Sequence, residues 1–420
     1  MRMRLAVVVI VLSCVFLTTQ AGPTSSAFSA VTANPSSTFA SAASFGGCAY
    51  TPATITPVWM TGFEHGVTTA AASSGLLDID WTASGTVSAD STVKRNGGYS
   101  MKIVRPSSDT VGRSRSVSSG MVVLRLAFRF NALPGGDLKD FTGVWSNNGN
   151  QLEIGYVSAS QKVNLGFAGG TKRLSGTTIS AGTWYVLDVR ANYTVNPHTA
   201  DWQLNAAAQT QATKSAAAEV PTEVWLGPDG GENVPLTMWF DDLLISQTSA
   251  DYPVGDGKVL ALSPDAMGAS SDPSGRLLNN DNTAWDASSW TKLTELPMTS
   301  TSTAIKQTVA DGSAYVGISF GDTAETCANA VQAEVAYHSS STTANVAKTS
   351  MMESGTERVV YSGAMNPNTT LTYRSAMISP ASGTWNQTKV NGLSARIGFG
   401  STIGAHPFWD ALMVQYNVDL

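Results

Sequence analysis

Charged residues are scarce in this sequence: Asp, Glu, Lys and Arg together make up 13% of its 420 residues, and the net charge is −6. No segment gathers Lys and Arg into a stripe, so nucleic acid and anionic membrane surfaces are not expected partners. Histidine is also rare, and its 4 residues lack the spacing of a zinc site. With these partners and metal sites not expected, neutral ligands such as glycans remain possible binding partners.

Long apolar runs are limited to the N-terminus, where "MRMR" precedes "LAVVVIVLSCVFL". A short basic segment followed by an apolar run and small residues is typical of an export signal, and we predict a signal peptide over residues 1–27. The run falls short of the roughly twenty residues that a membrane-spanning helix needs. We therefore expect a secreted, extracellular protein, free or associated with the cell surface, with no membrane insertion after the signal is cleaved.

Cysteine occurs only 3 times, and removal of the signal leaves Cys48 and Cys327. Two such residues can form a disulfide in an oxidising compartment. The sequence does not show whether they come within the short distance that a disulfide requires. A disulfide between Cys48 and Cys327 and two free thiols are therefore both possible.

Helical periodicity is sparse, whereas Gly, Ser, Thr and Asn separate short runs rich in β-branched and aromatic residues. Such runs predict strands. In "LRLAFRF" Leu124 and Leu126 share one face and Arg125 lies on the other, as in a half-buried antiparallel strand. The chain is also too long for one hydrophobic core. We therefore predict an all-β protein of more than one domain.

The strand-like runs fall into two groups. After the signal we predict a flexible mature N-terminus, a first sandwich, a linker passage and a second sandwich, at residues 28–57, 58–252, 253–284 and 285–420. The two groups end alike, because "WFDDLLI" from Trp239 aligns with "FWDALMV" from Phe408. We infer two similar β-sandwiches in tandem, each closed by the same kind of last strand.

Four segments of the first group carry a family resemblance: "MTGFEHG", "TVKRNGGYSMKIV", "AGTWYVLDVRANY" and "WFDDLLIS", in that order. Together they resemble the concanavalin-A-like and carbohydrate-binding jelly rolls of secreted proteins, over about Trp59 to Ser249. In such modules the Glu of the opening segment and an Asp of the closing strand often hold a structural calcium. That implies a calcium site at Glu64 and at Asp241 or Asp242. The fold implied is two tandem jelly-roll (concanavalin-A-like) β-sandwiches after a signal peptide.

The adjacent acids Asp241 and Asp242 interrupt an apolar strand. Burying an ionised carboxylate costs several kcal/mol unless it is paired or holds a metal. Neighbouring side chains of a strand point to opposite faces, so we do not expect the two acids to form one acid–base dyad. A calcium ion, which takes about six to eight oxygens, offsets the cost with Glu64 and nearby backbone carbonyls as further ligands. A solvated strand edge is the alternative.

Among the 11 tryptophans, Trp145 and Trp202 lie near expected turns and are candidates for exposed saccharide platforms. Trp184, Trp225 and Trp239 fall inside strand patterns, and we expect them in the core. The E-x-D-x-x-E run of catalytic jelly rolls of the laminarinase type does not occur. The sequence therefore favours binding over catalysis.

Two further resemblances concern delivery and assembly. Residues 1–45 resemble the leader of bacterial biofilm-fibre and camelysin-type proteins through "AFSAVTANPSSTFA", and "GTWNQTKVNGLSARIGF" resembles β-sandwiches of phage-like structural proteins. We expect a secreted, non-enzymatic protein that binds glycans or cell-surface proteins. Two alternatives stay open: a carbohydrate-active enzyme, either polysaccharide lyase or glycoside hydrolase, and a structural subunit of an extracellular fibre or phage-like assembly.

Overall fold

The computed structural model describes residues 55–68, 77, 79–272, 275–298, 301–340, 345–365, 371–403 and 406–419. The contacts of the two sandwiches lie within one compact unit, Thr51–Leu420. The predicted signal peptide and leader, residue Cys48 and most of segment 28–57 lie outside the described residues. Cys327 is disulfide-bonded, and whether its partner is Cys48, which the sequence left open, lies outside the described residues too. No helix among the described residues is long and apolar enough to cross a membrane.

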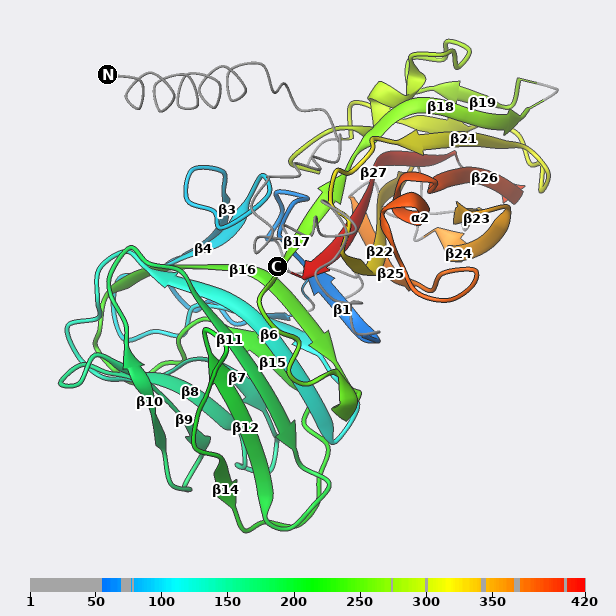
Figure 1. The fold of residues 1–420 in the computed structure, drawn as a ribbon. Helices are drawn as coiled ribbons and strands as arrows, with labels where there is room; N and C mark the ends of the chain where they lie inside the picture. The colour runs from blue at the N-terminus through cyan, green and yellow to red at the C-terminus, as the bar shows by residue number, and fades with distance from the viewer. Residues whose placement is uncertain are drawn as a thin grey trace, which may run out of the picture. The chain divides into compact units, whose positions relative to one another are not determined.

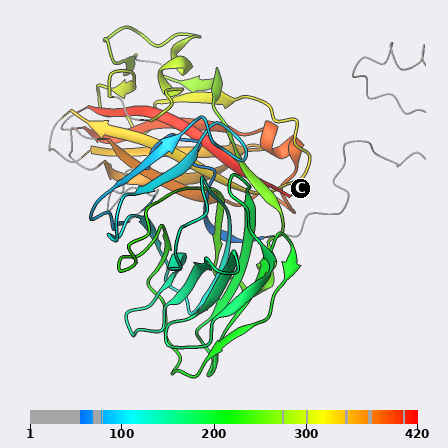
Figure 2. The ribbon, with the colours of Figure 1, turned by 90° about the vertical axis from the view of Figure 1, so that its left-hand side faces the viewer.

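The first sandwich consists of two antiparallel sheets (Figures 1 and 2). Sheet A contains β1 (Pro57–Thr61), β3 (Thr86–Asp90), β4 (Ser100–Arg105), β6 (Met121–Phe130), β11 (Tyr185–Asn192), β12 (His198–Leu204), β13 (Ala207–Ala208), β14 (Ala212–Lys214) and β16 (Leu236–Ser246). Sheet B contains β2 (Ile79–Asp80), β5 (Arg113–Ser116), β7 (Leu138–Trp145), β8 (Leu152–Val157), β9 (Lys162–Phe167), β10 (Arg173–Thr178) and β15 (Glu223–Leu226).

The second sandwich also has two sheets. Sheet C contains β17 (Gly257–Leu262), β19 (Leu277–Asn279), β20 (Ile305–Gln307), β22 (Ala328–Ser339), β25 (Thr372–Ile378) and β27 (Pro407–Asp419). Sheet D contains β18 (Pro264–Ser271), β21 (Tyr315–Phe320), β23 (Asn345–Glu353), β24 (Thr356–Met365) and β26 (Ser394–Ile403). Short helical turns occur at η1 (Ser249–Asp251), η2 (Ser289–Leu293) and α2 (Gln387–Asn391).

Both sandwiches repeat one strand order. In sheet A, β16 pairs with β6 on one side and with β4 and then β1 on the other; in sheet C, β27 pairs in the same way with β22, β20 and β17. The order β8-β7-β15-β5-β2 of sheet B recurs in sheet D as β24-β23-β26-β21-β18. The chain crosses between its two sheets in both halves, as in a jelly roll. The predicted fold of two tandem sandwiches, each closed by the same kind of last strand, is thereby confirmed.

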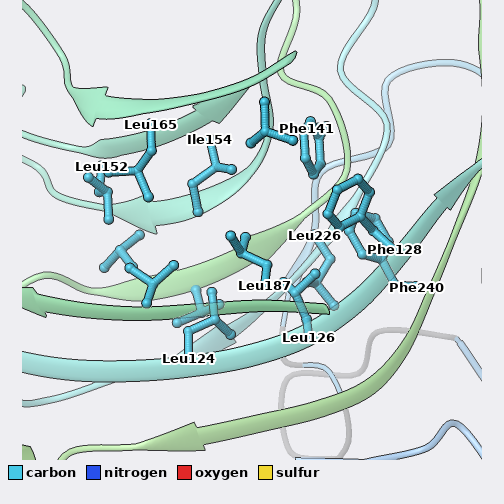
Figure 3. Packing of buried hydrophobic residues seen from close by; sticks show 14 of the residues in the cluster. Leu124, Leu126, Phe128, Phe141, Leu152, Ile154, Leu165, Leu187, Leu226 and Phe240 are labelled. Atoms are coloured by element: carbon cyan, nitrogen blue, oxygen red, sulfur yellow. The ribbon is translucent and has the colours of Figure 1, made fainter. Parts of the chain in front are cut away.

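The core of the first sandwich lies between sheets A and B and is built from alternate residues of each strand (Figure 3). Leu124 and Leu126 of β6 point into it, as the alternation predicts. Arg125, on the opposite face, is nevertheless fully buried and bonds to Asn417 of the second sandwich. The prediction of a half-buried strand is wrong for β6, because the second sandwich covers the face that would otherwise meet solvent.

The predicted linker at residues 253–284 is also wrong in the structure. β17 pairs along its whole length with β27, β18 pairs with β21, and β19 pairs with β20. The second sandwich therefore begins at Gly257 rather than at residue 285. Its first strands are short and interrupted by Gly and Pro, so their sequence resembles a linker, and only pairing with distant strands holds them in place.

Candidate functional site

The paired aspartates lie where β16 changes its partner. Leu236–Phe240 pair with β4, and Leu243–Ser246 pair with β1. On the other side of β16, the register with β6 shifts between Asp241 and Leu244, and Asp242 has a φ of 51°. These features describe a β-bulge, which interrupts the alternation of side chains. The aligned strand β27 also has a register shift at Asp410, the counterpart of Asp241.

Because of this bulge, both carboxylates meet the same segment. Asp241 Oδ2 accepts a hydrogen bond from Arg95 N at 2.8 Å, and its Oδ1 accepts one from Asp242 N at 2.8 Å. Asp242 Oδ2 accepts from Arg95 Nη1 at 2.7 Å and from Asn96 Nδ2 at 2.8 Å. The prediction that the two side chains point to opposite faces is therefore wrong. It assumed a regular strand, and the bulge removes that assumption.

Asp242 also joins the two sandwiches. Its Oδ1 accepts a hydrogen bond from Val259 N of β17 at 2.7 Å. Arg95 Nη1 donates to Gly257 O at 2.7 Å in addition to Asp242. The fully buried Arg125 donates from Nε to Asp242 O at 3.2 Å and from Nη2 to Asn417 Oδ1 at 2.6 Å. The carboxylate thus holds β17 against β16 and neutralises part of the charge of two arginines.

Glu64 lies in the turn after β1, beside the same segment. Its Oε2 accepts a hydrogen bond from Gly98 N at 2.6 Å, while Oε1 is buried with no hydrogen-bond partner among the described residues. Burial raises the pKa of Glu64 to about 8, and the negative charge of Asp242 adds to the rise. Burial and the same charge also raise the pKa of Asp241. The site is therefore rich in carboxylate oxygen and short of positive charge near Glu64.

The three acids predicted to hold calcium lie near one another, since the charges of Asp242 and Glu64 both raise the pKa of Asp241. The described residues contain no group of three or more His, Cys, Asp and Glu placed to hold a metal. Asp242 is engaged by Arg95, Asn96 and Val259. Glu64, with its partnerless Oε1, and Asp241 are the acids that fit a hard cation, with backbone oxygens as further ligands. The calcium site stays a prediction. Arg95, the second basic residue of "KRNGG", is a residue that sequence reasoning missed.

Gly97 offers a test of this packing. A Cβ atom built there would lie 1.7 Å from Glu64 Oε1, and the residue has a φ of 58°. We expect Gly97→Ala to lower the free energy of unfolding by about 2 kcal/mol, through backbone strain and displacement of a buried carboxylate. Urea unfolding measures it. Gly149→Ala is the control, because Gly149 has a φ of 72° but open space around it; equal losses in both variants would show that contact with Glu64 is unimportant.

A second candidate site is a cavity of about 170 Å³ on the first sandwich. It is lined by Trp81, Trp145 and Trp225, with Thr110, Arg113 and Asp229 among the polar neighbours. The ring centroids of Trp81 and Trp145 lie 6.4 Å apart, and those of Trp145 and Trp225 lie 5.3 Å apart. The rings are tilted by 33° and 38°. Three indole rings thus form a continuous apolar wall.

Strand alternation explains how Trp225 reaches this wall. Val224 and Leu226 point into the core, so Trp225 of β15 lies on the outer face of sheet B. Trp81, which follows β2, is 45% exposed. Its Nε1 donates to Glu223 Oε2 at 2.9 Å and to Ser114 Oγ at 3.2 Å. These bonds hold the exposed ring in a fixed orientation, as a preformed binding surface requires.

The tryptophan predictions had mixed outcomes. Trp145 lines the cavity. Trp202 is only 1% exposed and donates from Nε1 to Thr210 O, so its prediction as an exposed platform is wrong. It belongs to β12, whose alternate residues face the core. Trp225, expected in the core, lines the cavity instead, and the alternation of "EVWL" was the signal that would have placed it correctly.

Polar groups at the cavity are fixed by internal bonds. Arg113 donates from Nε to Thr68 O at 2.8 Å and pairs through Nη1 with Asp80. Asp229 Oδ1 accepts from Gly230 N at 2.7 Å. The acids around the tryptophans are engaged in the same way, because Asp80 pairs with Arg113 and Asp229 lies 3.8 Å from Lys139. With its charged groups paired internally, this surface is compatible with a neutral ligand.

Comparisons with known proteins give only distant likenesses. No protein-family model matches the chain, and no curated protein matches it by sequence. Among solved structures, a tandem CBM22 domain from Paenibacillus barcinonensis is 10% identical, with 86% of this chain and 98% of that chain covered and a TM-score of 0.25. The catalytic domain of a glycoside hydrolase family 131 protein from Coprinopsis cinerea is 15% identical, with 48% and 98% covered and a TM-score of 0.32.

Sialidases are also among the similar structures. A Trypanosoma rangeli sialidase is 10% identical, with 42% of this chain and 31% of that chain covered and a TM-score of 0.29. The chain spans only 17% to 32% of the length of the sialidases that it matches. Because these TM-scores lie below 0.5, the likenesses decide neither fold nor function. The strand order and register of the chain itself define its fold.

Proposed function

We propose that the chain is an exported, non-enzymatic protein that binds neutral glycans, free or on cell-surface proteins, through the tryptophan cavity of its first sandwich. The observation that carries this proposal is the wall formed by Trp81, Trp145 and Trp225. A pyranose ring has an apolar C–H face that packs on indole rings. Its hydroxyl groups suit the few polar groups at the rim, as is usual in small-molecule sites.

Two acids in the middle strands of sheet B are unsuited to catalysis. Asp140 and Glu153, in β7 and β8, are both buried. Burial raises the pKa of Asp140 to about 8. Glu153 forms ion pairs with Lys139 and Lys172. Two acids without access to solvent cannot act on the two sides of a glycosidic bond. Release of reducing or unsaturated sugars from glycans incubated with the protein would overturn the non-enzymatic assignment.

Trp81→Ala tests the binding site. We expect the dissociation constant for a glycan identified on an array of neutral oligosaccharides to rise roughly thirtyfold, because loss of a central tryptophan contact costs about 2 kcal/mol. Isothermal titration calorimetry measures it. Trp81 is 45% exposed, so its loss should leave the fold intact. Trp184→Ala is the matched control, because Trp184 does not line the cavity; equal weakening by both variants would count against this site.

Calcium is the proposed structural ligand at Glu64 and Asp241. A bound cation would supply the positive charge that Glu64 Oε1 lacks among the described residues. We expect calcium to raise the melting temperature relative to excess EDTA, since a ligand that binds only the folded state stabilises it. The shift should disappear in Glu64→Gln. An identical melting temperature in calcium and EDTA would remove the metal from the proposal without affecting the tryptophan cavity.

A further inference from the structure

The outer face of sheet D corresponds, in the repeated strand order, to the face of sheet B that carries the tryptophan cavity. Strands β21, β26 and β23 occupy the places of β5, β15 and β7. Tyr315 of β21 and Phe399 of β26 stack there, with ring centroids 5.2 Å apart and planes within 15°. Both rings are half-buried. Val316, the neighbour of Tyr315, points into the core, so Tyr315 lies on the outer side. Phe399 follows the core residue Ile397 by two positions, and the irregular backbone at Gly398 and Phe399, both with positive φ, brings its ring to the same side as Tyr315.

Phe399 is held in an unfavourable backbone conformation. Its φ is 58°, a region that costs a bulky residue roughly 1–2 kcal/mol. The bulge around it is fixed on both sides. Phe399 N donates to Ala314 O at 2.8 Å, and Gly400 N donates to Gln307 Oε1 at 2.8 Å. Strain that the surroundings enforce in this way is concentrated at functional positions, and here it presents an aromatic ring beside Tyr315.

Two cations complete the stack. The Arg396 guanidinium lies 4.4 Å from the centre of the Tyr315 ring, and Lys348 Nζ lies 4.4 Å from the centre of Phe399. Lys348 also pairs with Glu357 at 2.7 Å. Among the described residues, the Arg396 guanidinium forms no hydrogen bond and no direct ion pair, although its charge helps to lower the pKa of Glu357, the partner of Lys348. Stacking on Tyr315 orients the guanidinium of Arg396 and leaves its N–H groups able to donate hydrogen bonds. A planar guanidinium binds a carboxylate through two parallel hydrogen bonds.

We propose that this face is a second glycan site, specific for a saccharide that carries a carboxylate, such as a uronic acid residue. Arg396 binds the carboxylate, and the half-buried rings of Tyr315 and Phe399 contact the sugar. The first site, whose charged groups are paired internally, takes neutral glycans. The second site takes acidic ones, so the two sandwiches select different parts of a mixed polysaccharide. This inference does not depend on the tryptophan cavity, because its residues belong to the other sandwich.

The test compares oligogalacturonate with its methyl-esterified, uncharged counterpart, by titration calorimetry on the full chain. We expect the free acid to bind at least tenfold more tightly than the ester, and Arg396→Gln to weaken binding of the acid about tenfold or more. Arg396→Lys, which keeps the charge but not the planar fork, should retain part of the affinity. Arg358→Gln is the control, because this arginine of β24 bonds to Ser379 O instead of stacking on Tyr315.

The outcomes separate this site from the first one. Trp81→Ala should leave binding of the acid unchanged, while Arg396→Gln should leave binding of neutral glycans unchanged. Wild-type affinity for oligogalacturonate in a folded Arg396→Gln variant would overturn the proposal. The proposal would also fail if polyglutamate bound as tightly as oligogalacturonate and lost this affinity in Arg396→Gln, because the site would then recognise any carboxylate. Melting temperatures of all variants establish that each is folded. If Arg396→Gln does not fold, the ratio of acid to ester affinity in Arg396→Lys decides, and an unchanged ratio counts against the site.

Discussion

Replacing Asp242 with alanine should lower the free energy of unfolding by about 3–5 kcal/mol, the usual cost of removing one partner from a buried ion pair. The side chain of Asp242 is 1% exposed and pairs with Arg95 at 2.7 Å. Its loss leaves Val259 N without an acceptor and removes the negative charge that acts most strongly on the buried Arg125. Each of these groups would then be buried without compensation, which explains why the effect exceeds that of a surface ion pair.

Asp256→Ala provides the matched control. Asp256 pairs with the same arginine, Arg95, but its side chain is 51% exposed. We expect a loss of only about 0–1 kcal/mol there, because solvent screens the pair. Urea unfolding of both variants, monitored by tryptophan fluorescence, gives the comparison. A loss below about 1 kcal/mol in Asp242→Ala would show that the aspartate does not hold the two sandwiches together.

The strands and their repeat were predictable because they depend on local pattern. "WFDDLLI" and "FWDALMV" end the two halves and form the equivalent strands β16 and β27. The sequence also identified Asp241 and Asp242 as an energetic problem. It did not show how the charges are compensated, since Arg95 lies 147 residues from Asp242 along the chain. A bulge and its distant partners arise from tertiary pairing, which strand alternation cannot show.

The tryptophans show the same limit. Trp202 lies near a turn, yet its position in β12 directs the ring into the core, where Nε1 finds Thr210 O. Trp81 and Trp145 are far apart in sequence, and only the pairing of sheet B brings their rings within 6.4 Å. A cavity is a property of several strands together. Single-strand periodicity can place a side chain on a face, but it cannot show which faces meet.

The buried carboxylates should make the protein less stable as pH rises. Burial raises the pKa of Glu64 to about 8 and that of Glu334 to about 8, from an ordinary value of 4.5. The folded state therefore binds these protons more tightly than the unfolded state does. The stabilising contribution is fully present below about pH 4.5 and is lost as pH rises through about 8. We expect the melting temperature in EDTA to fall markedly between about pH 5 and about pH 9.

Glutamine at these two positions isolates the cause. Glu64→Gln keeps an acceptor for Gly98 N but cannot ionise, and Glu334→Gln removes the charge that Gln332 Nε2 contacts at 2.9 Å. Each pKa unit corresponds to about 1.4 kcal/mol, so the double variant should gain several kcal/mol over the wild type at about pH 9 and little at about pH 5. If the melting temperatures of the two proteins changed with pH in the same way across this range, neither acid would be protonated on folding. In excess calcium the contribution of Glu64 should shrink, because a bound cation replaces the proton as its compensating charge.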